Sequence, residues 1–234
     1  MRIVLVHPAG SNWVPGKKDM ATVANRMAPL GLLSISAYLK QAGHQVFLHD
    51  CLGPQAVPGT EANAKAILAH RPDLVGFSAT TSGFLDGHAL AARIKQSHPE
   101  IRTVFGGVHI SALGASLLGD FREIDYLCEG EGEGPLLDLA DGRAPRSIDG
   151  LVRRDGDQAV TNPPRTPIDN LDDLPFPDYE GLAGFPRGYQ LPLFSYIHEP
   201  GATMITSRGC PFQCSYCDRS VFKRSYRTNS ADYI

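Results

Sequence analysis

The sequence contains no uninterrupted apolar run of the length that a membrane-spanning helix requires. Such a helix needs about 18 or more consecutive apolar residues, whereas the hydrophobic residues of this chain, 42% of its 234, are spread over short runs. The apolar run at the start of the chain ends at His7 and Pro8, too early for the core of a signal peptide. These absences predict a cytoplasmic protein without a membrane partner.

The chain also lacks an excess of charge of either sign. It carries 22 Lys and Arg against 25 Asp and Glu, a formal net charge of -3. Nucleic-acid-binding proteins usually carry a basic excess that neutralises phosphates, so we predict no nucleic-acid partner. A length of 234 residues allows one well-packed core and a smaller appendage.

Cysteine is scarce, and its placement excludes a secreted disulfide framework. Of the five cysteines, Cys51 and Cys128 stand alone, whereas Cys210, Cys214 and Cys217 are spaced C-x3-C-x2-C. Disulfide-rich secreted domains instead distribute many cysteines along a short chain. The three grouped thiols indicate a metal-binding loop in a reducing compartment, directly after a short strand predicted over residues 202–206.

Three thiolates on one tight loop can bind three irons of a 4Fe-4S cluster, because these irons prefer soft sulfur ligands. The fourth iron would then have no protein ligand in view, whereas a structural metal site is normally closed by a fourth Cys or a His. The open corner indicates that a substrate or cofactor binds there. A zinc site completed by Cys51, Cys128 or a histidine is the alternative, although the spacing differs from the usual C-x2-C pairs.

Strand and helix patterns alternate through the first 142 residues. The strand patterns lie at 2–6, 44–49, 73–78, 102–105 and 124–128, and the helix patterns at 29–41, 60–70, 85–97 and 111–118. This alternation predicts an α/β domain with a parallel sheet covered by helices on both faces. The simplest topology is a flavodoxin-like, doubly wound, five-stranded sheet in the order 2-1-3-4-5, with a ligand crevice at the carboxyl ends of its strands.

Small and polar residues follow the strands at that predicted edge. Besides the loop at 7–12, the candidate binding residues are Ser78, Thr80, Thr81, Gly106, Gly107, His109, Gly130 and Glu131. Small residues let backbone N-H groups approach a bulky polar ligand closely. A glycine after one strand is also ordinary turn chemistry, but four such loops converging on one edge favour a binding site.

The pattern changes beyond residue 142. Residues 148–152 and 158–160 predict a hairpin with a glycine-containing turn. Residues 161–201 are rich in proline but retain apolar side chains, which predicts an ordered linker that wraps a neighbouring surface. We therefore predict an α/β domain at 1–142, a hairpin and linker at 143–201, and the start of a further domain at 202–234.

The cysteine motif, with Tyr216 directly before its last cysteine, is similar to the signature of the radical S-adenosylmethionine (radical SAM) enzymes. Residues 106–109 (GGVH), 130–133 (GEGE) and 174–179 (LPFPDY) resemble the cobalamin-binding subclass of that superfamily, whose N-terminal domain is Rossmann-like. The opening residues and the GGVH segment are also similar to the anaerobic magnesium-protoporphyrin cyclase group. The resemblance spans nearly the whole chain.

The resemblance implies that Cys210, Cys214 and Cys217 ligate a 4Fe-4S cluster whose open iron is chelated by the amino and carboxylate groups of S-adenosylmethionine. Electron transfer from the reduced cluster then cleaves the sulfonium to a 5′-deoxyadenosyl radical, the chemistry of the cofactor rather than of the protein. Tyr216 would lie near the adenine, or would be a core aromatic. The implied partners are a small-molecule substrate and an electron donor such as flavodoxin or ferredoxin. Arg208 and Arg219 flank the loop, where arginines are usually solvated.

The resemblance also implies that cobalamin binds in the strand-edge crevice, through the eight candidate residues named above. The axial-histidine pattern D-x-H-x-x-G is missing from the loop after the first strand, and residues 86–91 (DGHALA), the nearest match, fall within a predicted helix. We therefore expect no axial histidine from that motif, and the dimethylbenzimidazole tail in the crevice. His109 is a candidate contact to the corrin, although a loop histidine often serves only as a hydrogen-bonding residue.

Radical SAM enzymes build their active site from several βα units of a partial barrel, whereas this chain reaches only the first strand and the cluster loop. We expect the N-terminal part of a cobalamin-dependent radical SAM enzyme that drives methyl transfer or another radical reaction on an unactivated carbon, with the barrel supplied by a longer chain or another chain. The alternative is a corrinoid-binding or carrier module whose cysteines serve structure or redox sensing.

Overall fold

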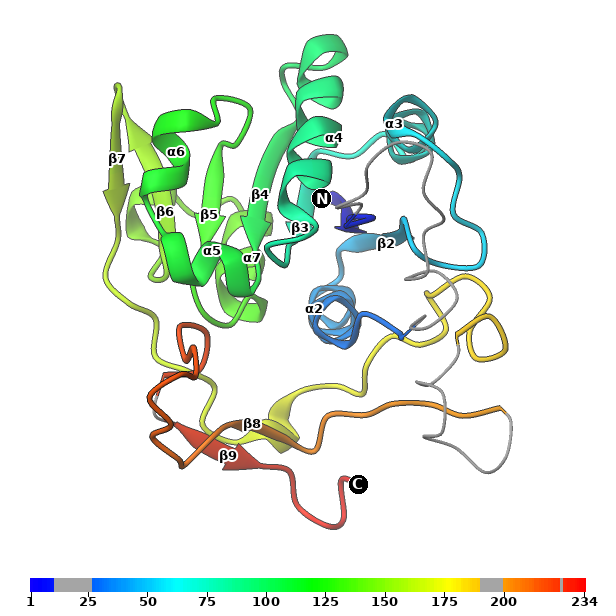
Figure 1. Cartoon of the computed structure of the whole chain (residues 1–234), viewed down its shortest axis with the longest axis vertical. Helices are drawn as coiled ribbons and strands as arrows, with labels where there is room; N and C mark the ends of the chain where they lie inside the picture. The colour runs from blue at the N-terminus through cyan, green and yellow to red at the C-terminus, as the bar shows by residue number, and fades with distance from the viewer. Residues whose placement is uncertain (11–26, 190–199, 224) are drawn as a thin grey trace.

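The computed structural model describes residues 1–10, 27–189, 200–223 and 225–234, in which a seven-stranded sheet is the central element (Figure 1). The strands follow the order β2-β1-β3-β4-β5-β6-β7. Their bounds are β1 (Arg2–His7), β2 (Gln45–Asp50), β3 (Leu74–Ser78), β4 (Arg102–Gly106), β5 (Tyr126–Cys128), β6 (Leu151–Asp155) and β7 (Gln158–Thr161). The first five strands are parallel, which confirms the predicted order 2-1-3-4-5.

Helices cover both faces of this sheet. They are α2 (Leu30–Gln41), α3 (Thr60–Ala69), α4 (Phe84–Ser97), α5 (Val108–Leu113), α6 (Ser116–Asp120) and α7 (Glu133–Ala140), with 3-10 turns η1 (Pro145–Ser147) and η2 (Leu171–Asp173). Apolar residues of α3, α4, α5 and α6 share one core cluster, and those of α2 and α7 share the other. Central strands buried on both sides explain why residues 3–6 are continuously apolar and fully buried.

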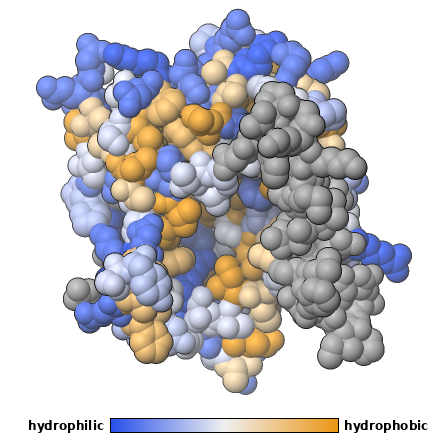
Figure 2. All heavy atoms as spheres, in the orientation of Figure 1, coloured by the Kyte–Doolittle hydropathy of each residue, from blue (hydrophilic) through white to orange (hydrophobic). Residues whose placement is uncertain are grey.

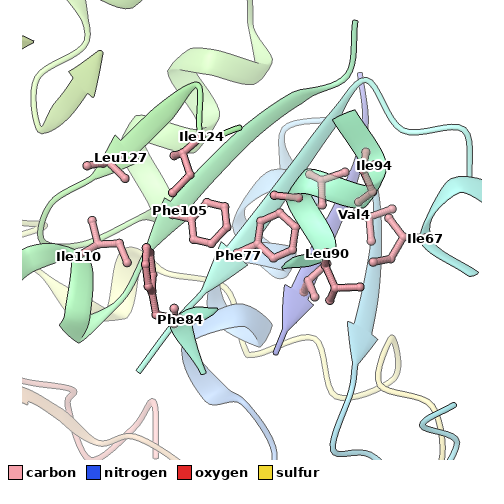
Figure 3. Packing of buried hydrophobic residues seen from close by; sticks show 14 of the residues in the cluster. Val4, Ile67, Phe77, Phe84, Leu90, Ile94, Phe105, Ile110, Ile124 and Leu127 are labelled. Carbon is pink, nitrogen blue, oxygen red and sulfur yellow. The ribbon is translucent and has the colours of Figure 1, made fainter. Parts of the chain in front are cut away.

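The core on the α3/α4 face is built around stacked aromatic rings (Figure 3). Phe77 of β3 and Phe105 of β4 lie with ring centroids 4.5 Å apart, and Phe84 of α4 meets Phe105 edge-on at 5.9 Å. Offset and edge-to-face pairs are the favourable arrangements of aromatic rings. This face is therefore tightly filled.

Three elements differ from the sequence-based predictions. The predicted helix at 111–118 is two short helices, α5 and α6, because Gly114 between them takes φ +57. Helix α7 was not predicted. The sheet has seven strands rather than five, because the β6–β7 hairpin pairs antiparallel with β5 and continues the sheet. The hairpin is thus part of the same layer as the parallel strands.

The strand predicted at 202–206 is also displaced. The strand is instead β8 (Ser207–Gly209), which ends directly before Cys210 and pairs antiparallel with β9 (Tyr226–Thr228). We call β8, β9 and the loop between them the cysteine hairpin. It lies beyond α2 on the side away from α3 and α4 (Figure 1).

The described part of the linker packs on α2, as predicted for an ordered linker. Asp178 accepts hydrogen bonds from the Ser36 hydroxyl at 2.5 Å and the Lys40 ammonium at 2.6 Å, both on α2. Further along, the Tyr189 hydroxyl donates to Asp50 at 2.9 Å. The linker is thereby fixed to both α2 and the end of β2; residues 190–199 of the predicted linker lie outside the described part.

The visible surface mixes hydrophilic and hydrophobic residues, and hydrophobic residues gather on its middle and lower parts (Figure 2). Exposed apolar side chains include Phe176 of the linker, Met204 and Ile205 directly before β8, and Phe212 of the cysteine hairpin. Among the described residues, none of the helices has the length and apolar character needed to cross a membrane.

Replacing Phe105 by Ala should destabilise the protein by about 3–5 kcal/mol, because the ring is fully buried and the surrounding core would leave a cavity. Urea unfolding followed by circular dichroism measures the change. The control is Phe212→Ala, whose side chain is 70% exposed and should change stability by less than about 0.5 kcal/mol. Equal effects of the two substitutions would contradict the assigned core.

Candidate functional site

The loops after β3 and β4 are locked together at the carboxyl edge of the sheet. The backbone N-H of Ala79 donates to Gly106 O at 2.9 Å, and the N-H of His109 donates to Ala79 O at 3.4 Å. Gly107 has φ +100, and a Cβ there would lie 2.7 Å from Ala79 O. Only glycine permits this approach, so the GGVH segment serves to bring two edge loops into contact.

A cavity of about 210 Å³ opens beside these loops, between the sheet, α2 and the cysteine hairpin. Five of the eight predicted cobalamin contacts line it: Ser78, Gly106, Gly107, Gly130 and Glu131. Residues that follow the strands thus line one cavity, and their contact with cobalamin stays a prediction.

Gly76 lies in the middle of β3 on the α2/α7 face and lines this cavity. A Cβ on Gly76 would lie 3.0 Å from a Leu5 methyl group and 3.6 Å from Val104. Leu32 and Leu136, from α2 and α7, close the opposite wall. The floor is apolar and the mouth is lined by small residues, an arrangement suited to a ligand with a flat apolar portion and a polar remainder.

The other three predicted contacts gather in a separate group. His109 Nδ1 lies 3.2 Å from the Thr81 hydroxyl, and the Thr80 hydroxyl lies 2.9 Å from that of Ser82. The His109 ring packs on Phe84 with centroids 4.6 Å apart, and burial lowers the pKa of His109. Within the described structure its Nε2 is buried and has no hydrogen-bond partner. His109 therefore lies on α5 rather than in the predicted loop, and its neutral imidazole packs against Phe84 of α4 instead of lining the cavity.

Two arginines of the cysteine hairpin bind two carboxylates at the end of β5. Arg208 donates to Glu131 at 3.2 Å, to Glu133 at 2.6 Å and to the Ser34 hydroxyl at 3.0 Å. Arg227 donates to both carboxylate oxygens of Glu131, at 2.8 and 3.2 Å. We call these five residues the Arg–Glu cluster. It is the direct link between the cysteine hairpin and the sheet.

The Arg–Glu cluster is buried, and its charges are balanced. Arg208 is 9% exposed and Glu133 3% exposed. Burial alone would raise the pKa of Glu131, but the hydrogen bonds and positive charges of Arg227 and Arg208 outweigh it and hold that pKa below its ordinary value. The expectation that Arg208 is solvated was therefore wrong, because its carboxylate partners are distant in sequence.

The three clustered cysteines are exposed on the loop between β8 and β9. The N-H of Cys210 donates to Ser225 O at 3.1 Å, which fixes only the start of the loop. Across the described ranges, no three His, Cys, Asp or Glu side chains form a group that could hold a metal ion. Tyr216 is 89% exposed, so the alternative role of a core aromatic is wrong. The donor set suits an iron-sulfur cluster, but the loop does not present it gathered.

The two isolated cysteines, Cys51 and Cys128, are buried. Burial, with the charges of Asp50 and Asp86, raises the pKa of Cys51 to about 12. Burial, with Glu133 adding to it, raises the pKa of Cys128 to about 12. Both are therefore protonated in the absence of metal. Neither belongs to a group of three His, Cys, Asp or Glu side chains that could hold a metal ion among the described residues.

A second cavity of about 540 Å³ adjoins the first. The two share Gly130, Glu131, Val221 and Phe222 as lining residues. Burial raises the pKa of Glu129, which also lines the second cavity together with Lys223. The combined space runs from the floor at Gly76 to the cysteine hairpin.

The nearest match to the axial-histidine pattern lies on α4, as predicted. His88 pairs with Glu123 at 2.9 Å, and its ring packs on Phe121 at 4.7 Å. These contacts place His88 on the face of the sheet opposite to the cavity. No cofactor role follows from it.

Acidification should weaken the Arg–Glu cluster. Because the folded pKa of Glu131 lies below its ordinary value of 4.5, its contribution to stability is complete above that pH and is lost as the pH falls through the folded value. Glu131→Gln should lower stability at neutral pH and reduce the loss of stability between about pH 5 and 3. Urea unfolding at several pH values tests this.

The matched control for this substitution is Glu61→Gln. Glu61 also pairs with an arginine, Arg93, but its side chain is 71% exposed. Exposed pairs contribute little, so this variant should follow the wild-type curve. An acid dependence that is identical in wild type and Glu131→Gln would contradict the role assigned to Glu131.

Comparison with known proteins gives these features a context. Residues 16–140 match the model of the B12 binding domain family. The chain is 30% identical over 241 residues to the uncharacterized methyltransferase PH0819 of Pyrococcus horikoshii, covering 100% of this chain and 49% of that protein. It is 29% identical to the anaerobic magnesium-protoporphyrin IX monomethyl ester cyclase of Rubrivivax gelatinosus, covering 97% and 40%. These matches confirm the family resemblance.

A third relative is the cobalamin-dependent radical SAM methyltransferase TokK of Streptomyces tokunonensis, 28% identical over 156 residues, or 63% of this chain and 22% of that protein. The chain spans about half the length, or less, of these relatives. The solved radical S-adenosylmethionine methyltransferase TsrM from Kitasatospora setae has the same fold, with a TM-score of 0.68 and 21% identity, over 99% of this chain and 44% of that one. With the family match covering more than half of its residues, the chain belongs to the B12 binding domain family.

Proposed function

We propose that the chain is the N-terminal part of a cobalamin-dependent radical SAM enzyme that drives methyl transfer, or another radical reaction, on an unactivated carbon. The observation that carries this proposal is that predicted cobalamin-binding residues and the cysteine hairpin line the same cavity. The cavity of about 210 Å³ has five of the predicted cobalamin-binding residues on one side, and on the other Ile205 with the cysteine-hairpin residues Arg208, Val221 and Phe222. The relatives named above support the same class of enzyme.

The cavity fits the nucleotide tail of cobalamin in shape and polarity. An aromatic base would lie on the apolar floor above Gly76, between Leu5, Val104 and Leu32. Ser78 and the backbone of Gly106 and Gly107 would bind the polar portions at the mouth. Glycine is expected where a large ligand approaches the backbone closely, because a Cβ at such a position would narrow the site.

Protein ligation of cobalt is not part of this proposal. His109 carries a buried Nε2 without a hydrogen-bond partner in the described structure, and a hydrogen bond from it to a corrin amide would require the ring, now packed on Phe84, to expose that nitrogen. Thr80 and Thr81 would stand beside it. Glu131 would meet the cofactor only along its side, because Arg208, Arg227 and the N-H of Ile168 already occupy its carboxylate.

Cys210, Cys214 and Cys217 would hold the 4Fe-4S cluster, and Tyr216 would adjoin the adenine of S-adenosylmethionine. When bound and reduced, the cluster would supply the electron that cleaves S-adenosylmethionine, and cobalamin would supply a methyl carrier. The chain contributes an accessible loop whose first residue, Cys210, is held to Ser225. Exposure of this loop suits an electron donor such as flavodoxin or ferredoxin, and the adjoining cavity of about 540 Å³ suits a small-molecule substrate.

One observation favours a second function, a corrinoid-binding or carrier module. The three cysteines are all exposed and are not gathered, as expected of a loop used for structure or redox sensing. In that case the cavity would bind the corrinoid and the hairpin would not bind iron. Both functions predict binding of hydroxocobalamin, and only the radical enzyme predicts uptake of an iron-sulfur cluster.

Hydroxocobalamin binding, followed by the shift of the corrin spectrum, tests the cavity. Gly76→Val should weaken binding by tenfold or more, because the added methyl groups enter the floor beside Leu5. The matched control is Gly119→Val on α6, where a Cβ meets nothing within 4 Å. Equal affinities for wild type and Gly76→Val would place the cofactor elsewhere.

Anaerobic reconstitution with iron and sulfide tests the cysteine loop. Wild type should become brown and absorb near 400 nm, and Cys214→Ala should lose most of that absorbance together with bound iron. Cys51→Ala is the control, since this thiol is buried and lies outside the C-x3-C-x2-C motif. Failure of the wild-type chain to take up a cluster would reject the radical enzyme and leave the carrier module.

A further inference from the structure

The cysteine hairpin is too small to hold its own position. Each of its strands has three residues, and within the described ranges β8 pairs with β9 alone. An isolated two-stranded hairpin is marginally stable at best. Its place next to the cavity therefore depends on contacts made with the sheet and the linker.

The Arg–Glu cluster supplies the buried part of those contacts. Arg208, two residues before Cys210, reaches Glu131 and Glu133 at the end of β5, more than 70 positions away in sequence. Arg227, on the other strand, grips Glu131 with both terminal nitrogens. The linker joins through Ile168, whose N-H donates to Glu131 at 3.1 Å. Both strands of the hairpin are thus held by one carboxylate.

Separating the hairpin from the sheet would cost free energy, because it would unpair carboxylates at the sheet edge. Glu131 and Glu133 would lose the two positive charges that balance them, and a buried charge without its partner is strongly destabilising. The structure shows the hairpin docked with these charges paired, and an undocked hairpin would have to turn the carboxylates to water. The two parallel hydrogen bonds of an arginine–carboxylate pair require a fixed geometry, so partly docked positions of the hairpin are unfavourable.

A ligand in the cavity would contact residues of the sheet edge and residues of the docked hairpin. Arg208, Glu131 and Glu133 line the cavity themselves, together with Val221 and Phe222 of the hairpin. Arg227 lines the larger cavity and not the smaller one. A ligand seated over Gly76 gains the hairpin wall only when the hairpin is docked.

We propose that Arg208, Arg227 and Glu131 are positioning residues that couple the cysteine hairpin to the cofactor cavity, so that cobalamin binding and docking of the hairpin favour each other. The proposal rests on the proposed function in taking cobalamin as the ligand. Coupling between two sites is reciprocal: the factor by which the docked hairpin tightens cobalamin binding is the factor by which cobalamin favours docking. Cofactor loading would thereby bring the cysteines to the cavity.

Hydrogen exchange of the 234-residue chain, measured by mass spectrometry with and without hydroxocobalamin, tests the coupling. In wild type, hydroxocobalamin should slow exchange in β8 and β9. Arg227→Gln should speed exchange there and weaken hydroxocobalamin binding about 5-fold or more, although Arg227 does not line the smaller cavity. A merely structural role would speed exchange and leave the dissociation constant unchanged, which would overturn the proposal.

The matched control is Arg93→Gln, which breaks the exposed pair with Glu61 and should change neither quantity. If Arg227→Gln loses protection in β1 and β3 and so fails to fold, Arg227→Lys replaces it: lysine keeps the charge but lacks the two-pronged fit, and the same two results decide.

The outcomes also separate this proposal from the proposed function. Wild type that shows no corrin spectral shift overturns both. Wild type that binds hydroxocobalamin while exchange in β8 and β9 stays unchanged overturns the coupling alone. Slower exchange in β8 and β9, with weaker binding in the arginine variant, supports both.

Discussion

The carboxylate of Glu131 is the contact on which the arrangement of sheet, linker and cysteine hairpin depends. One oxygen accepts from Arg208 and Arg227, and the other accepts from Arg227 and the N-H of Ile168. Three segments distant in sequence thus meet at one buried group. Burying a charge is unfavourable unless it is fully paired, so the site tolerates this one arrangement and disfavours partial ones.

A second constraint is the difference between the two faces of the sheet. The α3/α4 face is filled by the rings of Phe77, Phe84 and Phe105. On the α2/α7 face, Gly76 occupies a position where its strand neighbours carry Leu5 and Val104. The side chains of Leu5, Val104 and Leu136 pack closely over Gly76, and the cavity that these residues line reaches the cysteine hairpin.

Much of the fold could be predicted from sequence because it follows local patterns. Continuous apolar runs such as residues 3–6 marked the parallel strands, and several residues after them line the cavity. The antiparallel extension by β6 and β7 could not be predicted, because pairing with β5 is decided by long-range contacts. Helix α7 was missed because it begins at Glu133, inside a run of alternating Gly and Glu that suggests a loop.

The sequence predicted which residues belong to the candidate site better than it predicted how they are arranged. The spacing of Cys210, Cys214 and Cys217 indicates which metal the loop suits, but local spacing does not determine whether the thiols are gathered. Arg208 was misjudged for the same reason: its burial depends on Glu131 and Glu133, to which no periodicity in the sequence connects it. Gly76 offered the clearest unused signal, since glycine in the middle of a central strand is unfavourable without a purpose.

The cavity over Gly76 also links the fate of the protein to the supply of its ligand. A fold that keeps open space in its core forgoes packing contacts, and any molecule that fills this space stabilises the folded state by mass action. Cells degrade chains in proportion to how often they unfold. The steady-state amount of this protein would therefore rise and fall with the availability of the ligand, so that chains without it are removed sooner than chains that carry it.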